Sequence, residues 1–189
     1  MKIGLISDSH IPEAMPELPQ QVRAIFAGCD LILHAGDLHC LEVLDWLEEI
    51  APVLACRGNG DEGSGGRPVV PEDSRLRDAV MTTGAGFRIG MVHDVLLPDE
   101  FPQWPVERTM ECYFSGRTDV IVCGHTHVES IKRYGDVMVI NPGSPTFPHN
   151  YSAQPGTAAV LTLDENRGGE VIIYDLKTLT ALPGLAAAF

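Results

Sequence analysis

Seven polar side chains that can ligate a metal ion each follow an apolar run of the sequence. They comprise two carboxylates, one amide and four imidazoles: Asp8, His10, Asp37, Asn59, His93, His125 and His127. Mixed oxygen and nitrogen donors suit Mn, Fe, Co, Ni or Zn ions better than Ca²⁺ or Mg²⁺. One ion rarely takes seven protein ligands and keeps an open position, whereas two ions sharing a carboxylate would use them all. Such a pair could act on the attacking and leaving oxygens of a phosphoryl displacement.

Each of these residues, taken alone, is better explained as a turn former or a polar cap, because Asp and Asn are common after strands. Gly36, Gly58 and Gly124 directly precede three of the seven. A residue without Cβ allows a sharp turn and a close approach to a ligand. The seven residues in order therefore favour a metal site.

Short apolar runs and helix-like segments alternate in the amino-terminal third. Strands are expected over residues 2–6, 31–35 and 52–56, with helices over 19–27 and 41–50. This β-α-β-α-β order predicts a parallel sheet with crossover helices. Ligands of such sheets bind beyond the carboxyl ends of the strands, where these polar residues fall.

Paired strands are expected in the remainder of the chain, after a surface loop at 60–73. The predicted pairs are 79–83 with 87–93 around Gly84-Ala85-Gly86, 131–134 with 137–140 around Gly135-Asp136, and 157–163 with 170–174. A helix at 106–114 and a buried strand at 119–123 complete the pattern. We predict one α/β domain over residues 1–189, with two sheets and outer helices. The apolar tail, 176–189, either packs on the domain or forms a homo-oligomer contact.

The composition excludes several classes of protein. Among 189 residues, 13 Lys and Arg oppose 26 Asp and Glu, for a formal net charge of −13. Affinity for a long nucleic acid comes mostly from basic side chains, so no such partner is expected. No run approaches the roughly 20 apolar residues of a membrane span. The chain opens with no secretory signal, and its five cysteines at irregular spacing indicate a reducing compartment, so we expect a cytoplasmic protein.

The motifs resemble, in order, those of the calcineurin-like metallophosphoesterases. They are Asp8-Ser9-His10, Gly36-Asp37, Gly58-Asn59, His93 after a strand, and Gly124-His125-Thr126-His127. The sequences Ile6 to His10, Arg57 to Asp61 and Asn141 to Ser144 look most like the small prokaryotic YfcE-type phosphodiesterase branch.

The resemblance implies a two-sheet β-sandwich flanked by helices, in α/β/β/α layers. It also implies one divalent metal held by Asp8, His10, Asp37 and His127, and a second held by Asp37, Asn59, His93 and His125. Asp37 would bridge them, a hydroxide between the metals would be the nucleophile, and Asp37, Asn59 and His93 would be catalytic. Manganese is the ion expected to support assays, and a small soluble phosphodiester is the expected substrate.

Gly60 stands where many relatives have a histidine thought to protonate the leaving group. His39 could face the site in that role, or start the following helix. Arg57 could contact a substrate phosphate or pair with an acidic neighbour. Asp61 could orient a ligand, shuttle a proton or cap its loop.

Other functions on the same fold remain open from the sequence. A phosphomonoesterase or nucleotide phosphatase would use the same site, and a non-catalytic scaffold would use the fold alone. A nuclease would need a basic groove, which the few scattered Lys and Arg residues do not suggest.

Overall fold

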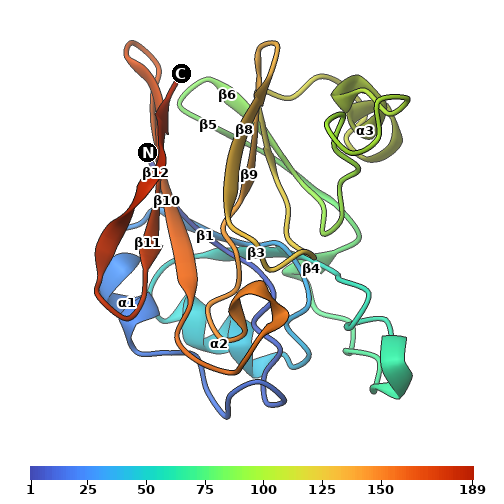
Figure 1. Cartoon of the computed structure of the whole chain (residues 1–189), viewed down its shortest axis with the longest axis vertical. Helices are drawn as coiled ribbons and strands as arrows, with labels where there is room; N and C mark the ends of the chain where they lie inside the picture. The colour runs from blue at the N-terminus through green and yellow to red at the C-terminus, as the bar shows by residue number, and fades with distance from the viewer.

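The first of two sheets contains the amino-terminal strand and the strands that precede Asp8, Asp37 and Asn59 (Figure 1). The computed structural model describes residues 1–189, and this sheet has seven strands in the order β12-β11-β10-β1-β2-β3-β4. Their bounds are β1 Lys2–Ile6, β2 Leu31–His34, β3 Val53–Cys56, β4 Leu76–Arg77, β10 Thr157–Asp164, β11 Gly168–Asp175 and β12 Thr180–Ala188. Strands β1 to β4 pair in parallel, and β10 to β12 add antiparallel strands beside β1.

The second sheet has five strands in the order β5-β6-β7-β9-β8. Their bounds are β5 Val80–Gly84, β6 Phe87–Met91, β7 Val120–Val122, β8 Ser130–Tyr134 and β9 Val137–Asn141. The central strands β6, β7 and β9 pair in parallel, whereas β5 and β8 are antiparallel edges. Both sheets are therefore mixed.

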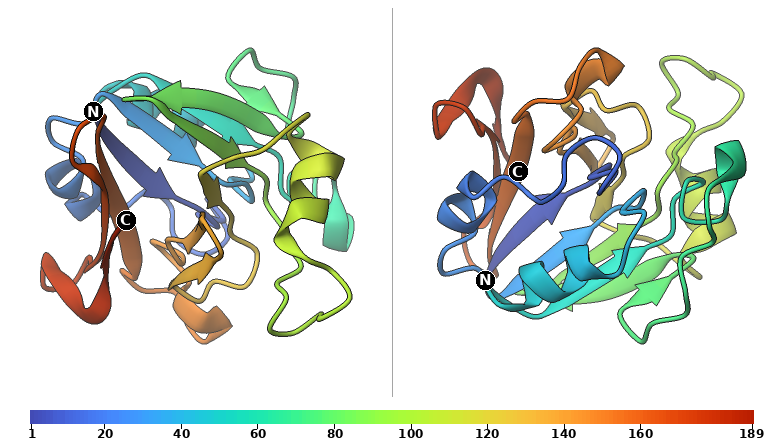
Figure 2. Two further views of the ribbon diagram at one scale, coloured as in Figure 1. Left: turned by 90° about the horizontal axis from the view of Figure 1, so that it is seen from above. Right: turned by 90° about the horizontal axis from the view of Figure 1, so that it is seen from below.

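The apolar residues separate into three cores that define four layers (Figure 2). Alternating residues of β1, such as Ile3 and Leu5, pack between the two sheets, against Ile89 of β6 and Val122 of β7. A second core lies under α1 (Gln21–Ile25) and α2 (Glu42–Glu48), on the outer face of the first sheet. A third lies under α3 (Val106–Tyr113), on the outer face of the second sheet. The expected α/β/β/α layering is confirmed.

The predicted elements match the observed ones with small differences in their ends. The β5–β6 turn is shorter than expected, because Gly84 belongs to β5 and only Ala85 and Gly86, both with positive φ, form it. Two strands were not predicted. Strand β4 has only two residues, and β12 occupies the tail, which packs on the edge of the first sheet.

The longest helix, α3, has eight residues, so none of the helices could span a membrane.

Two 3₁₀ turns interrupt the loops, η1 at Ser64–Gly66 and η2 at Pro148–Asn150. The second turn lies in the segment between β9 and β10, which returns toward the loops that follow β1 and β7.

Candidate metal centre

The seven candidate ligands all lie just beyond the carboxyl ends of parallel strands. Asp8 and His10 follow β1, Asp37 follows β2 and Asn59 follows β3; His93 follows β6, and His125 and His127 follow β7. Each sheet thus contributes candidate ligands to the same edge of the molecule. The convergence predicted from the sequence is what the structure shows.

Five of the seven candidate ligand residues have left-handed backbone conformations. The φ values are 55° for Asp8, 46° for His10, 55° for Asp37, 68° for His125 and 59° for His127. Residues other than glycine adopt this region at a cost of about 1 kcal/mol or more each, and such residues concentrate at functional sites. The loops therefore hold an unfavourable backbone conformation at the positions where side chains must converge.

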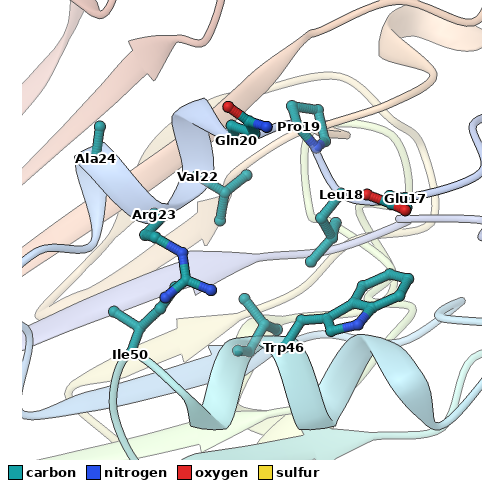
Figure 3. A pocket seen from close by; sticks show the side chains of 10 residues that line it. Glu17, Leu18, Pro19, Gln20, Val22, Arg23, Ala24, Trp46 and Ile50 are labelled. Carbon is teal, nitrogen blue, oxygen red and sulfur yellow. The ribbon is translucent and has the colours of Figure 1, made fainter.

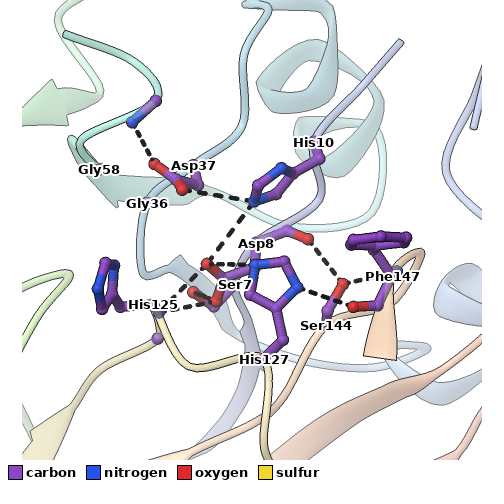
Figure 4. A network of polar contacts seen from close by, with 12 residues as sticks. Ser7, Asp8, His10, Gly36, Asp37, Gly58, His125, His127, Ser144 and Phe147 are labelled. Carbon is purple, nitrogen blue, oxygen red and sulfur yellow. Dashed lines mark hydrogen bonds and ion pairs between the residues drawn. The ribbon is translucent and has the colours of Figure 1, made fainter. Parts of the chain in front are cut away.

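Asp8 lies at the centre of the first group of ligands, as Figure 4 shows. Its Oδ1 atom is 3.9 Å from Nε2 of His10, 3.5 Å from Nε2 of His127 and 4.0 Å from Nε2 of His93. Asp8 is fully buried, and its Oδ2 atom accepts hydrogen bonds from Ser7 Oγ and the backbone of His125. The Oδ1 atom shares the His125 N–H at 3.2 Å and faces the three imidazole nitrogens.

Asp37 lies between two histidines and turns a different oxygen toward each. Its Oδ2 is 3.4 Å from Nε2 of His10, and its Oδ1 is 3.5 Å from Nε2 of His93. Beyond His93, Nδ1 of His125 lies 3.3 Å from Nε2 of His93 and 3.0 Å from Oδ1 of Asn59. The donors therefore fall into two groups that meet at Asp37.

Backbone carbonyls orient two of the rings. His93 Nδ1 donates to the carbonyl of Ala35 at 2.7 Å, and His127 Nδ1 donates to the carbonyl of Phe147 at 2.7 Å. A hydrogen bond at Nδ1 fixes the tautomer and leaves Nε2 as the free donor to a metal ion. In both rings that Nε2 faces the carboxylates.

The carboxylates dominate the electrostatics of these rings. Burial disfavours the charged forms of His10 and His93, but nearby Asp37 and Asp8 outweigh it and raise the pKa of each ring to about 9. Burial likewise opposes ionisation of Asp37, yet His10 and His93 hold its pKa well below the usual range. In the metal-free site, protonated His10 and His93 thus neutralise the ionised carboxylates. A bound divalent cation would take over this role.

The donor set fits a divalent transition metal. Nε2 of His10 is buried and has no hydrogen-bond partner, although buried polar atoms are normally paired. Asp8, His10 and His127 lie close enough to share an ion, and so do Asp8, Asp37 and His93. Imidazole and carboxylate together suit Zn, Mn, Fe, Co or Ni.

Arg57 and Asp61 are engaged within their own loops. The Arg57 guanidinium donates to the carbonyls of Val70 and Pro71 and pairs with Glu72, with its side chain 8% exposed. The structure thus shows the salt-bridge alternative for Arg57.

Asp61 is fully buried and accepts hydrogen bonds from the backbone N–H groups of Asp37, His39 and Gly58. It ties the β2 and β3 loops together, as the loop-capping alternative requires. Burial raises its pKa.

His39 lies beside the site and occupies the space next to Gly60. A Cβ atom at position 60 would collide with Nε2 of His39 and would lie 2.9 Å from its Cδ2. The ring of His39 lies 4.2 Å from the ring of His10, and its Nδ1 is 3.4 Å from Glu13. Neither ring nitrogen has a hydrogen-bond partner, and the ring lies beside His10 in the loop before α2, which begins only at Glu42.

The end of β9 and the segment after it contribute contacts that support the loops carrying the candidate ligands. Ser144 Oγ donates to the carbonyl of Asp8 at 2.7 Å, and the side-chain amide of Asn141 donates to the carbonyl of Gly124 at 2.8 Å. Both residues belong to the Asn141 to Ser144 motif, so the signal was in the sequence, without a role attached.

A cavity of about 630 Å³ lies elsewhere, between α1 and α2 on the outer face of the first sheet (Figure 3). Val22, Arg23, Trp46 and Ile50 line it, and none of the seven ligands does.

Comparison with known proteins identifies the family to which this fold and site belong. The model of the calcineurin-like phosphoesterase superfamily domain matches residues 1–166, and the chain belongs to this superfamily. A probable metallophosphoesterase of Methanothermobacter thermautotrophicus is 36% identical over 148 residues, which cover 78% of this chain and 79% of the relative. A phosphodiesterase of Methanocaldococcus jannaschii is 28% identical over 153 residues, covering 76% and 83% respectively.

Solved structures share the fold. Vacuolar protein sorting 29 of Cryptosporidium parvum aligns with a TM-score of 0.74 at 20% identity, covering 100% of this chain and 96% of the other. Yfce, a phosphoesterase of E. coli, aligns with a TM-score of 0.64 at 21% identity, covering 100% and 99%. The resemblance stated from the motifs is thereby confirmed.

Proposed function

We propose that the protein is a metal-dependent phosphodiesterase with a dinuclear centre, acting on a small soluble phosphodiester. The observation that carries the proposal is the position of Asp37, whose two oxygens face His10 on one side and His93 on the other. One ion would be held by Asp8, His10, Asp37 and His127, and the second by Asp37, Asn59, His93 and His125.

Two divalent cations at these ligands would supply Lewis-acid stabilisation of phosphoryl oxygens and a water-derived nucleophile at neutral pH. The side chains of this chain do the positioning. Asp8, Asp37, His93 and His127 are buried, whereas Asn59 and His125 are exposed. The substrate phosphate therefore approaches from the side of Asn59 and His125, while the buried carboxylates hold the opposite side of the site dry.

His39 is the candidate to contact the leaving group, since its ring fills the place left by Gly60. Its Nδ1 faces Glu13, so Nε2 is the nitrogen turned toward residue 60 and the metal-ligand loops. Arg57 and Asp61 instead support the loops on which Asn59 and Asp37 lie.

The phosphodiesterase of M. jannaschii supports a diester over a monoester. The alternative is a non-catalytic scaffold of the same fold, a fold that the chain shares with vacuolar protein sorting 29 (Vps29). All seven candidate ligands are present here in converging positions, which supports the enzyme. Because a Vps29 of Entamoeba histolytica was solved with Zn²⁺, turnover rather than metal binding separates the two functions.

The experiment removes metal with a chelator, restores Mn²⁺, and compares hydrolysis of bis-p-nitrophenyl phosphate and p-nitrophenyl phosphate. We expect Mn²⁺-dependent turnover with the diester preferred, and loss of most turnover in His93→Ala. A purified protein that binds no transition metal and hydrolyses neither ester would contradict the proposal. Preference for the monoester would replace it with a phosphomonoesterase at the same site.

A further inference from the structure

The segment between β9 and β10 carries an exposed aromatic pair. Tyr151 is 84% exposed, more than any other large hydrophobic side chain of the protein. Its ring stacks on His149, with the centroids 5.9 Å apart and the planes inclined by 13°. One face of the tyrosine is therefore supported from behind by a second ring, and the other is open to solvent.

This pair belongs to a segment that is bound directly to the metal-ligand loops. Figure 4 shows Ser144 and Phe147 beside Asp8 and His127. Four hydrogen bonds make the attachment: Ser144 Oγ to the carbonyl of Asp8 (2.7 Å), Thr146 Oγ1 to the carbonyl of Ser9 (2.6 Å), His127 Nδ1 to the carbonyl of Phe147 (2.7 Å) and the His149 N–H to the carbonyl of His127 (3.0 Å). The segment that carries the aromatic pair is thus bound to the loops that hold Asp8 and His127.

The backbone at the pair is held in an unfavourable conformation. His149 and Asn150 have φ values of 56° and 58°, both in the left-handed region. The contact of His149 Nε2 with Glu129 Oε2 at 3.2 Å holds the imidazole in place. Two consecutive left-handed residues persist only where surrounding contacts determine them, and such segments are common at ligand sites.

We propose that His149 and Tyr151 form a stacking subsite for a planar, nucleobase-like group of the substrate whose phosphate reaches the metal centre. This inference rests on the proposed function and narrows its substrate to a nucleotide-type phosphodiester. A ring supported on one face and open on the other accepts any base, because every base has a π-face. Stacking on one aromatic side chain improves affinity by about 5-fold to 100-fold.

The test compares two ligands that differ only in the base. Adenosine 5′-monophosphate and ribose 5-phosphate are titrated by calorimetry into the full-length, Mn²⁺-loaded protein. We expect the nucleotide to bind at least about 5-fold more tightly to the wild type. In Tyr151→Ala the two dissociation constants become equal, and in Tyr151→Phe the preference remains.

Tyr113→Ala is the matched control, since Tyr113 is an exposed aromatic residue at the end of α3. It precedes β7 in the chain, whereas the candidate ligands follow the carboxyl end of that strand. It should keep the wild-type preference. Equal binding of the two ligands by the wild type, or an unchanged preference in Tyr151→Ala, would overturn the subsite. Hydrolysis of bis-p-nitrophenyl phosphate by the same samples tests the proposed function separately, because calorimetry needs no turnover.

Discussion

At the scale of single residues, the site is a set of groups whose protonation opposes metal binding. The pKa of His10 and of His93 is raised to about 9 by the carboxylates of Asp37 and Asp8, despite burial. Both rings are therefore protonated at neutral pH in the metal-free protein. A ring must lose its proton before it can ligate a cation, so metal uptake releases protons.

We predict that binding of Mn²⁺ at pH 8 releases about two protons, one from each ring. The sign follows from the raised pKa values. As pH falls below 9, a larger fraction of the two rings is protonated, so the affinity for Mn²⁺ decreases by up to about 100-fold per pH unit. Calorimetry in two buffers of different ionisation enthalpy measures the number released.

His93→Gln is the matched variant, because it leaves one titrating ring and should release about one proton. A wild-type affinity that is independent of pH and of buffer would show that both rings are already neutral in the metal-free protein.

His34 is a buried histidine outside the ligand set. Its Nδ1 accepts from the Gly36 N–H and its Nε2 therefore carries the hydrogen that reaches Ser9 Oγ at 2.9 Å. Burial lowers its pKa to about 4. The unfolded chain therefore binds a proton at His34 near pH 6.5, whereas the folded chain binds it only near pH 4. The stabilisation is complete above pH 6.5 and is lost as pH falls from 6.5 to 4.

We predict that this one ring contributes about 3 kcal/mol to the acid destabilisation of the metal-free protein. His10 and His93 are protonated in both states below pH 6.5 and add little slope there. Urea unfolding at pH 7 and pH 4.5 should show a clearly smaller loss of stability in His34→Gln than in the wild type. His39 acts in the same window, because burial also lowers its pKa to about 4, so the variant keeps part of the loss. Equal losses in the variant and the wild type would mean that His34 does not contribute.

At the scale of the elements, strand ends and glycines position the ligands. Gly124 is the second residue after β7, and a Cβ there would collide with Ser7 Oγ and lie 2.6 Å from Asp8 Oδ2. The close approach of the β1 and β7 loops thus requires glycine. Any side chain at position 124 would displace the central carboxylate.

We predict that Gly124→Ala weakens Mn²⁺ affinity by about 10-fold or more, as loss of a supporting contact to a metal ligand does. Gly4→Ala is the control, because its Cβ would lie 2.9 Å from the ring of Phe26 in the core under α1. Both variants should lose about 1 to 3 kcal/mol of stability by overpacking, but only Gly124→Ala should lose affinity. Equal affinities in the two variants would contradict a role for Gly124 at the site.

The sequence predicted most elements because their patterns are local. Alternation and helical spacing located β1, β2, β3, α2 and α3 within one or two residues. Strand β12 was missed because Pro183 and Gly184 argue against a strand, and the structure accommodates them where the register with β11 shifts between Ile172 and Tyr174. The contact between His39 and Gly60 joins two loops, and only the fold could reveal it.

At the scale of the whole molecule, acidic side chains outnumber basic ones two to one, and about half of the basic side chains are paired. Six of the thirteen basic side chains are paired with carboxylates: Arg23, Arg57, Arg67, Arg75, Arg117 and Lys132. Arg75 alone contacts Asp45, Glu48 and Asp73. We therefore expect the excess of acidic groups to repel a long polyanion, whereas the proposed small phosphodiester would need only the local field of bound metal ions.

This distribution predicts how salt affects catalysis. Between 10 and 150 mM salt, the screening length falls from about 30 Å to about 8 Å, which weakens the repulsion between the acidic surface and an anion. We expect kcat/KM for bis-p-nitrophenyl phosphate to rise slightly, by less than about 3-fold. Cleavage of single-stranded DNA should be slow and should also rise with salt. Cleavage by a protein that binds DNA through a basic groove falls with salt, because added salt reduces the free energy gained when counterions leave the DNA. A fall of 10-fold or more in DNA cleavage over this range would therefore establish a nucleic-acid groove and contradict the small-substrate assignment.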